Sequence, residues 1–275
     1  MPTHPAPRAP RVRAVLLACL LAVTAACSSG SPGPAAVTGD GVRYGGGDEG
    51  VVPPALAHVT APSSATADGG IPIGPGGVGT TGDGDVVVEV YYDPACPWCQ
   101  RLEAMYGDAL LDLVDAGGVT LVHRPLAFLD ARWGGTYSTR AVHALAVVAD
   151  ATPELYPALH AALLEHQPEA GEPAGLDDDA IAALARDVGV PADVVDRFTA
   201  TAGTAYEVET ADGTERRVTS SRVLAPWVAA ATAQASVDLG EVSVPTVLVD
   251  GAPVGDWTEP GSLTALVASA VAARG

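Results

Sequence analysis

The sequence predicts an α/β fold in which a β-α-β unit is followed by a long helical insertion and then by a return to sheet. A run of β-branched residues over 86–92 indicates a buried strand, amphipathic helical spacing follows over 97–116, and a second strand, parallel to the first, is expected over 119–124. Helical spacing then dominates the insertion, about residues 136–240, and residues 242–249 return to a strand pattern.

Residues 1–26 are organised like a bacterial secretory signal. Three arginines precede an apolar stretch over 14–26, which is too short to span a bilayer. The stretch ends in Val-Thr-Ala-Ala before Cys27, and this resembles a lipobox, in which small residues precede a cysteine that becomes the lipidated N-terminus. Ordinary cleavage near Ala26, with Cys27 as a spectator, is the alternative. On either reading the mature chain is exported, and lipidation would hold it at the outer face of the cell membrane.

A segment rich in glycine and proline follows the signal. Residues 28–84 contain 16 Gly and 7 Pro among 57 residues, with few large apolar side chains, so most of the segment cannot bury enough surface to offset its ordering entropy. We therefore expect a flexible tether over 27–67 and a folded domain over 68–275. Near the boundary, residues 71–74 alternate apolar and breaker residues and are expected to add an edge strand.

Composition limits the classes of partner. Of the 275 residues, 33 are acidic and 14 are basic, and every basic residue is arginine, so no Lys-rich patch is present to neutralise phosphates. Nucleic acid is therefore not an expected partner. Of the four cysteines, Cys19 leaves with the signal and Cys27 is the lipidation candidate, so no structural disulfide framework remains.

The tetrad Cys96-Pro97-Trp98-Cys99 lies where the first strand ends and the amphipathic helix begins. A tight turn over 93–95 places Cys96 at the helix N-terminus, where free backbone N–H groups and the helix dipole favour a thiolate. Pro97 suits the first helical position. Cys99 lies on the same helical face, one turn deeper, so we expect Cys96 to be the attacking thiol and Cys99 the resolving thiol.

Two other interpretations of the tetrad are weaker. As a zinc half-site it lacks a second cysteine pair, and His123 is the one plausible helper. As a structural disulfide it closes a loop of four residues, for which the chain-entropy model gives only about 2 kcal/mol. Redox catalysis is therefore the favoured interpretation, and no metal site is expected. The remaining histidines and tryptophans on apolar faces are expected to pack rather than react: His143, His160, Trp133, Trp227 and Trp257.

Apolar spacing and start signals predict the remaining elements. Residues 206–219 fit either a hairpin or a loop. Pro245 opens the final strand, and a turn over 250–253 leads to a last helix near 260–273. Helices of the insertion are expected near 137–150, 153–166, 178–188, 191–200 and 222–238.

The tetrad, the later Val244-Pro245-Thr246 and the helical stretch between them resemble the DsbA-like branch of the thioredoxin superfamily over about 68–275. The resemblance implies a thioredoxin-like fold with an inserted helical subdomain. It also implies that Pro245 is cis and faces the redox helix, and that Val244 offers backbone hydrogen bonds to a substrate chain.

The sequence departs from that family at two points. Its most oxidising members have Pro-His between the cysteines, where this chain has Pro-Trp, and their buried carboxylate six residues before the first cysteine is replaced by Val90. Glu89 is one residue away, on the opposite face of the strand. Asp93 is a nearby acid that suits a turn residue satisfying backbone donors, so no proton transfer is assigned to it.

Motif and resemblance together predict an extracytoplasmic, membrane-anchored thiol-disulfide oxidoreductase that acts on cysteine-containing exported proteins. It needs no organic cofactor, but it needs a membrane redox partner that recycles the dithiol. Two alternatives remain open: a tethered thioredoxin-fold binding module without turnover, and a reductase serving metal or cytochrome assembly. The net direction depends on a difference in thiolate stabilisation of only a few kcal/mol, which the residue pattern does not fix.

Overall fold

The elements of the fold belong to one compact unit, Pro32–Gly275. The expected signal beyond Met1, the lipidation candidate Cys27 and most of the expected tether lie outside the described residues. Within the described residues, no helix combines the length and apolar character needed to cross a bilayer. The computed structural model describes Met1 and residues 37–38, 41–42, 54–172, 174–202, 206–209, 215–218 and 221–275.

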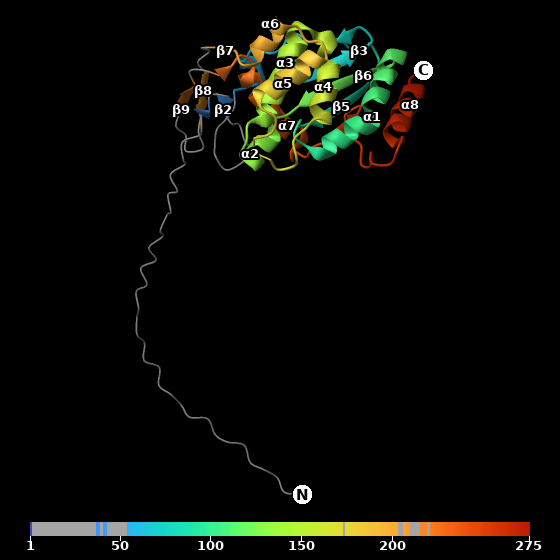
Figure 1. Cartoon of the computed structure of the whole chain (residues 1–275). Helices are drawn as coiled ribbons and strands as arrows, with labels where there is room; N and C mark the ends of the chain where they lie inside the picture. Colours follow the sequence, from blue (N-terminus) through green and yellow to red (C-terminus); the bar gives the residue numbers. More distant parts are fainter. Residues whose placement is uncertain are drawn as a thin grey trace. The chain divides into compact units, whose positions relative to one another are not determined.

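A six-stranded sheet forms the centre of the unit, in the order β12-β11-β5-β6-β3-β4 (Figure 1). The two middle strands, β5 (Val86–Tyr92) and β6 (Val119–Pro125), are parallel, as the sequence predicts. Every residue of β6 is buried, because helices cover both faces of the sheet. The strands next to the middle pair, β11 (Thr246–Val249) and β3 (Ile71–Gly74), run antiparallel to it. The outermost strands, β12 (Ala252–Pro253) and β4 (Gly77–Val78), run antiparallel to β11 and β3 respectively.

The helix α1 (Pro97–Ala116) connects β5 to β6 and has the predicted bounds. It ends before Gly117, whose φ of +87° is one that a side-chain-bearing residue rarely adopts. Together with α8 (Ser262–Ala272) it covers one face of the sheet, and α7 (Ala225–Leu239) packs on the other face, against β6. The first turn of α1 therefore stands at the carboxyl ends of the two parallel strands.

The helical insertion groups beside the sheet (Figure 1). Its central helix, α3 (Tyr137–Ala151), is buried on every side from Tyr137 to Ala149. Four helices contact it: α2 (Phe128–Trp133), α4 (Tyr156–Glu165), α5 (Asp178–Asp187) and α7. Two further helices of the insertion, α4 and α5, begin close to their predicted starts. Asp177 caps α5 by accepting a hydrogen bond from the N–H of Ala180. The helix α4 is preceded by the 3-10 turn η2 (Pro153–Leu155).

Several local predictions need correction. A short helix, α2 (Phe128–Trp133), was not predicted, because six residues are too few to show helical periodicity. The single helix expected over 191–200 is instead α6 (Ala192–Val195) followed by the 3-10 turn η3 (Asp196–Phe198). The expected final strand over 242–249 is paired only from Thr246, since Pro245 has no N–H to donate to a ladder.

Within the ambiguous stretch over 206–219, the described residues pair as the hairpin interpretation expects: β8 (Tyr206–Glu209) runs antiparallel to β9 (Glu215–Val218). Next to it in the sequence, β7 (Thr201–Ala202) pairs with β10 (Ser221–Arg222). The insertion therefore contains short strands as well as helices.

Residues before the expected boundary near residue 68 also contact the domain. The 3-10 turn η1 (Leu56–His58) places Leu56 against the hydrophobic core, and Val59 packs there too. Ser64 donates through Oγ to the carbonyl oxygen of Ala149 at 2.5 Å. Residues 54–67 therefore pack on the domain, because their few apolar side chains reach the core. The strand β3, expected at an edge, has the two-residue β4 outside it.

Candidate active site

Cys96 occupies the N-cap of α1, in extended conformation, directly after the turn that follows β5. Its N–H donates to the carbonyl oxygen of Asp93 at 2.9 Å, and its own carbonyl accepts from the N–H groups of Cys99 and Gln100 at 3.0 and 3.1 Å. Pro97 takes the first helical position, where no intrahelical hydrogen bond is lost. The sulfur therefore stands at the positive end of a 20-residue helix. We call residues 93–99 the redox turn.

The two thiols of the redox turn are electrostatically unequal. A hydrogen bond from the Cys99 side chain, opposed by burial and assisted by the backbone N–H groups of Cys99 and Trp98, lowers the pKa of Cys96 to about 7. Burial, followed by the neighbouring Cys96 sulfur, raises the pKa of Cys99 well above its ordinary value. Exposure is 5% for Cys96 and 1% for Cys99. The arrangement thus separates a thiol that ionises near neutral pH from a thiol that stays protonated.

The loop before β11 lies against Cys96. The peptide bond between Val244 and Pro245 is cis, and the Cys96 Sγ donates to the carbonyl oxygen of Val244 at 3.4 Å. Both loop residues are half-buried. The structure therefore brings Val244 and Pro245 to the redox turn, as the resemblance implies.

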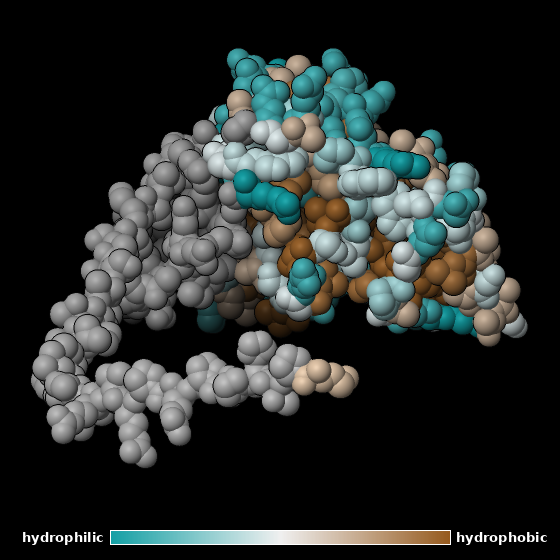
Figure 2. Space-filling view, turned by 90° about the horizontal axis from the view of Figure 1, so that it is seen from below, coloured by the Kyte–Doolittle hydropathy of each residue, from teal (hydrophilic) through white to brown (hydrophobic). Residues whose placement is uncertain are grey.

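Trp98 presents an exposed aromatic surface beside the sulfur. Its side chain is 52% exposed, its ring meets that of Trp257 edge-to-face at 6.3 Å, and the Arg101 guanidinium lies 5.4 Å from its ring centre. The Tyr106 hydroxyl lies 2.8 and 2.6 Å from the carbonyl oxygens of Trp257 and Glu259 and shares its one hydrogen between them, which fixes their loop against α1. Trp257 thus packs, as expected, but it also supports Trp98. Apolar surface rimmed by hydrophilic residues is visible on the face drawn in Figure 2.

Asp93 connects the redox turn to the helical insertion, which the sequence did not reveal. Its fully buried carboxylate accepts from the N–H of Ala95 at 2.9 Å, the N–H of Leu129 at 2.8 Å and the Ser138 hydroxyl at 2.6 Å. Burial, only partly offset by these donors, raises the pKa of Asp93 to about 7. The predicted turn role is confirmed. The added partners, from α2 and from the first turn of α3, come from segments far away in the sequence.

Glu89 has a separate role. Its carboxylate accepts from the Nε of Arg124 at 2.7 Å, and Arg124 also stacks over the ring of Tyr91, 5.3 Å from its centre. Tyr91 packs with Ala235 of α7, so this pair lies on the sheet face opposite α1. Glu89 therefore makes an ion pair away from the thiols.

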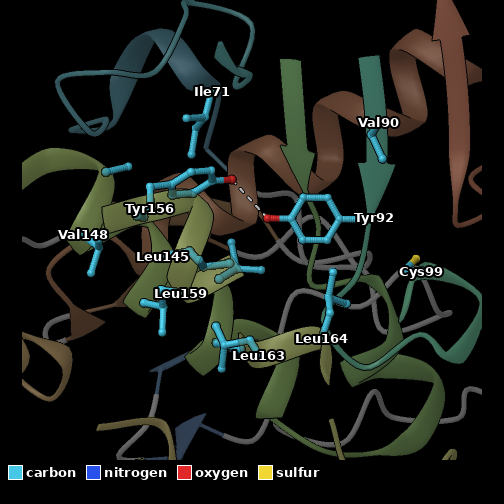
Figure 3. Close-up of a cluster of buried hydrophobic side chains, with 14 of the residues drawn as sticks. Ile71, Val90, Tyr92, Cys99, Leu145, Val148, Tyr156, Leu159, Leu163 and Leu164 are labelled. Atoms are coloured by element: carbon cyan, nitrogen blue, oxygen red, sulfur yellow. Dashed lines mark hydrogen bonds between the residues drawn. The ribbon is translucent and has the colours of Figure 1, made fainter. Parts of the chain in front are cut away.

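A cluster of buried aromatic and histidine side chains lies near Cys99. The hydroxyls of Tyr92 and Tyr156 are 3.1 Å apart, and Figure 3 marks the hydrogen bond between them with a dashed line. The ring centres of His123 and His160 are 4.2 Å apart, and the Nε2 of His160 lies 3.1 Å from the Glu103 carboxylate. Burial lowers the pKa of His123 well below its ordinary value, so its ring is neutral. Among the described residues, no three His, Cys, Asp or Glu side chains group as metal ligands.

Comparison with known proteins agrees with this geometry. A family model described as Thioredoxin matches residues 79–268, well over half of the chain and the whole of the site described above. Among curated protein sequences the comparison finds no match.

Solved structures share the fold. MdbA, a thiol-disulfide oxidoreductase from Actinomyces oris, is 20% identical, with 78% of this chain and 96% of that chain covered and a TM-score of 0.57. The disulfide bond oxidoreductase DsbG from Mycobacterium tuberculosis is 26% identical over 69% and 82% of the two chains, with a TM-score of 0.52. DsbA from the same organism is 23% identical over 75% and 100%, with a TM-score of 0.53. Since the family model spans most of it, the chain belongs to the thioredoxin family and has the DsbA-like form of its fold, that of the thiol-disulfide oxidoreductases it resembles.

Proposed function

We propose that this protein is an extracytoplasmic thiol-disulfide oxidoreductase that exchanges disulfides with cysteine-containing exported proteins through Cys96 and Cys99. The observation that carries the proposal is the pair of thiols at the start of α1, whose pKa values are shifted in opposite directions. A structural disulfide needs no such asymmetry, whereas thiol exchange needs one thiolate that attacks and leaves readily at neutral pH.

In the oxidising direction the enzyme starts with a Cys96–Cys99 disulfide. A substrate thiolate attacks the Cys96 sulfur, the bond between Cys96 and Cys99 breaks, and Cys99 takes a proton as it leaves. A second substrate thiolate then attacks the substrate sulfur of the mixed disulfide, which releases Cys96 as a thiolate. Two electrons pass from the substrate thiols to the enzyme dithiol, and a membrane redox partner removes them. Reduction of a substrate disulfide follows the same steps backwards.

The Cys96 thiolate supports a moderate rather than an extreme redox potential. Its pKa of about 7 resembles the value of about 7 in thioredoxin more than the value of about 3.5 in strongly oxidising DsbA. Since a more stable thiolate favours the reduced enzyme, we expect the pair to be a weaker oxidant than one with a potential of about −120 mV. A titration in glutathione and dithiothreitol buffers, read by alkylation mass shifts, measures the value.

The test of function is dithiol exchange by the mature chain with a two-cysteine peptide and with its disulfide form. Cys96→Ser is expected to reduce exchange to the uncatalysed rate, and a fully active variant would overturn the proposal. A Cys96→Ser/Cys99→Ser double variant gives the discriminating comparison. If the unaltered chain catalyses nothing and both proteins bind the peptide equally, the chain is a binding module.

We further propose that the mature protein is anchored at the outer face of the cell membrane through lipidated Cys27, which lies outside the described residues. The support is the small-residue sequence before that cysteine. Mass spectrometry of the mature N-terminus is expected to show a lipid-modified cysteine, and Cys27→Ser is expected to move the protein from the membrane to the soluble fraction. An unmodified N-terminus near Ala26 would contradict the anchor.

A further inference from the structure

Gln167, which follows α4, reaches from the helical insertion to the redox turn. Its half-buried side chain donates through Nε2 to the carbonyl oxygen of Pro94 at 2.9 Å and to that of Cys96 at 3.2 Å. A carboxamide nitrogen carries two hydrogens, so both contacts can form together. The side chain thus bridges the two carbonyls that lie on either side of the Ala95–Cys96 segment.

The Cys96 carbonyl is a sensitive place for such a contact. It already accepts the first two backbone hydrogen bonds of α1, from Cys99 and Gln100. The backbone N–H groups of Trp98 and Cys99 act on the Cys96 sulfur. The direction in which these two N–H groups point relative to the sulfur depends on the backbone conformation of Cys96 at the start of α1. A donor that fixes the Pro94 and Cys96 carbonyls therefore fixes the position of the sulfur over the end of the helix.

We propose that Gln167 is a positioning residue through which the helical insertion holds the redox turn in the conformation that makes Cys96 reactive. The inference rests on the proposed function and deepens it, because it assigns the insertion a part in setting thiol reactivity. Gln167 reaches no reacting atom in the structure; its two contacts are with main-chain oxygens.

The molecule provides a matched control. The Gln100 side chain donates through Nε2 to the carbonyl oxygen of Glu165 at 3.2 Å, and so it joins α1 to the end of α4, two residues before Gln167 in the sequence. Its side chain makes no hydrogen bond to the redox turn in the described residues. Loss of either glutamine removes a hydrogen bond between the insertion and the region around the start of α1, but only loss of Gln167 frees the carbonyls of Pro94 and Cys96.

The experiment measures the rate of Cys96 alkylation against pH, together with the equilibrium redox potential, in Gln167→Ala, Gln167→Glu and Gln100→Ala of the mature chain. Gln167→Ala removes hydrogen bonds worth about 1 kcal/mol, and this is expected to slow alkylation of Cys96 at pH 6 about fivefold. The midpoint of the curve of alkylation rate against pH is expected to move to higher pH. Gln167→Glu places acceptors against two carbonyl oxygens, so its effect is expected to be larger. Gln100→Ala is expected to stay within about twofold of the unaltered chain.

An unchanged pH profile and potential in Gln167→Ala would overturn the inference and leave Gln167 a purely structural tie. The same holds if Gln100→Ala shifts both readouts as much as Gln167→Ala does. Urea unfolding of each variant separates loss of stability from loss of positioning. Alkylation needs no turnover, so a failure of dithiol exchange would defeat the proposed function without affecting this result.

Discussion

The sheet with its redox helix and the helical insertion contribute different things to one site. The first region supplies both thiols, the exposed Trp98 and the carbonyl of Val244. The insertion and the α2 segment before it supply no sulfur, but they hold the turn through donors to Asp93 and through Gln167. The reactive atoms therefore come from one β-α junction, whereas the groups that hold this junction in place come from elsewhere in the chain.

The largest effect is expected from a change in the first region. Cys99→Ser removes the resolving thiol, so a mixed disulfide on Cys96 can no longer be released from within the enzyme. The Cys96 thiolate attacks the disulfide form of the two-cysteine peptide, and one peptide sulfur leaves as a thiolate. The resulting covalent adduct should accumulate and turnover should cease, as mass spectrometry under non-reducing conditions would show. The double variant lacking both thiols is the control and should form no adduct. Normal multiple turnover by Cys99→Ser would refute the division between attacking and resolving thiols.

A core change in the insertion should affect stability without affecting the thiol. Leu159 of α4 is 0% exposed, so Leu159→Ala is expected to lower the free energy of unfolding by about 2–5 kcal/mol. The pH profile of Cys96 alkylation should remain that of the unaltered chain under folding conditions. Leu266→Ala, at a site that is 45% exposed on α8, serves as the control and should cost less than about 0.5 kcal/mol. A shifted alkylation profile in Leu159→Ala would show that the two regions are not separable in this way.

Asp93 joins the two regions, and its ionisation should make stability depend on pH. Its folded pKa of about 7 lies above the unfolded value of about 3.9, so its stabilising effect is complete below pH 3.9 and is lost as pH rises through 7. Asp93→Asn should remove that decline. It should also cost about 1–3 kcal/mol at low pH, because the new amide hydrogens face the N–H of Leu129.

Urea unfolding of both proteins between pH 4 and pH 7.5 tests this linkage. The difference between the two curves isolates Asp93 from the other titrating groups. If the difference in free energy of unfolding between the two proteins stays constant from pH 4 to pH 7.5, Asp93 ionisation is not linked to stability in this way.

The smallest effect on the thiol is expected from Trp98→Ala. The backbone N–H of Trp98 acts on the Cys96 sulfur, so loss of the indole should leave the alkylation midpoint within about 0.3 unit and the free energy of unfolding within about 0.5 kcal/mol. Contact with peptide substrates should weaken, seen as a higher KM. An alkylation midpoint that moves as far as in Gln167→Ala would show that the side chain tunes the thiol directly.

The sequence-based predictions are accurate where an element has a strong local pattern, and they fail where the element is very short or depends on contacts with distant residues. The strand β5, the helix α1 and the parallel strand β6 were predicted well because each has a strong local pattern. The short α2 and the broken helix after Pro191 were missed because so few residues show no reliable period. The contacts of Leu56 and Val59, within the expected tether, were not predicted because these two side chains pack against a core formed by distant segments.

The sequence by itself determined where the sulfurs lie. A strand, a tight turn and a helix that opens with Pro97 place Cys96 at a helix start and Cys99 one turn later, whatever surrounds them. Only the tertiary structure decided what contacts them. Val244 is 148 residues from Cys96 and Gln167 is 71 residues away, and no local periodicity encodes such contacts, because they depend on how whole helices and loops pack against the sheet.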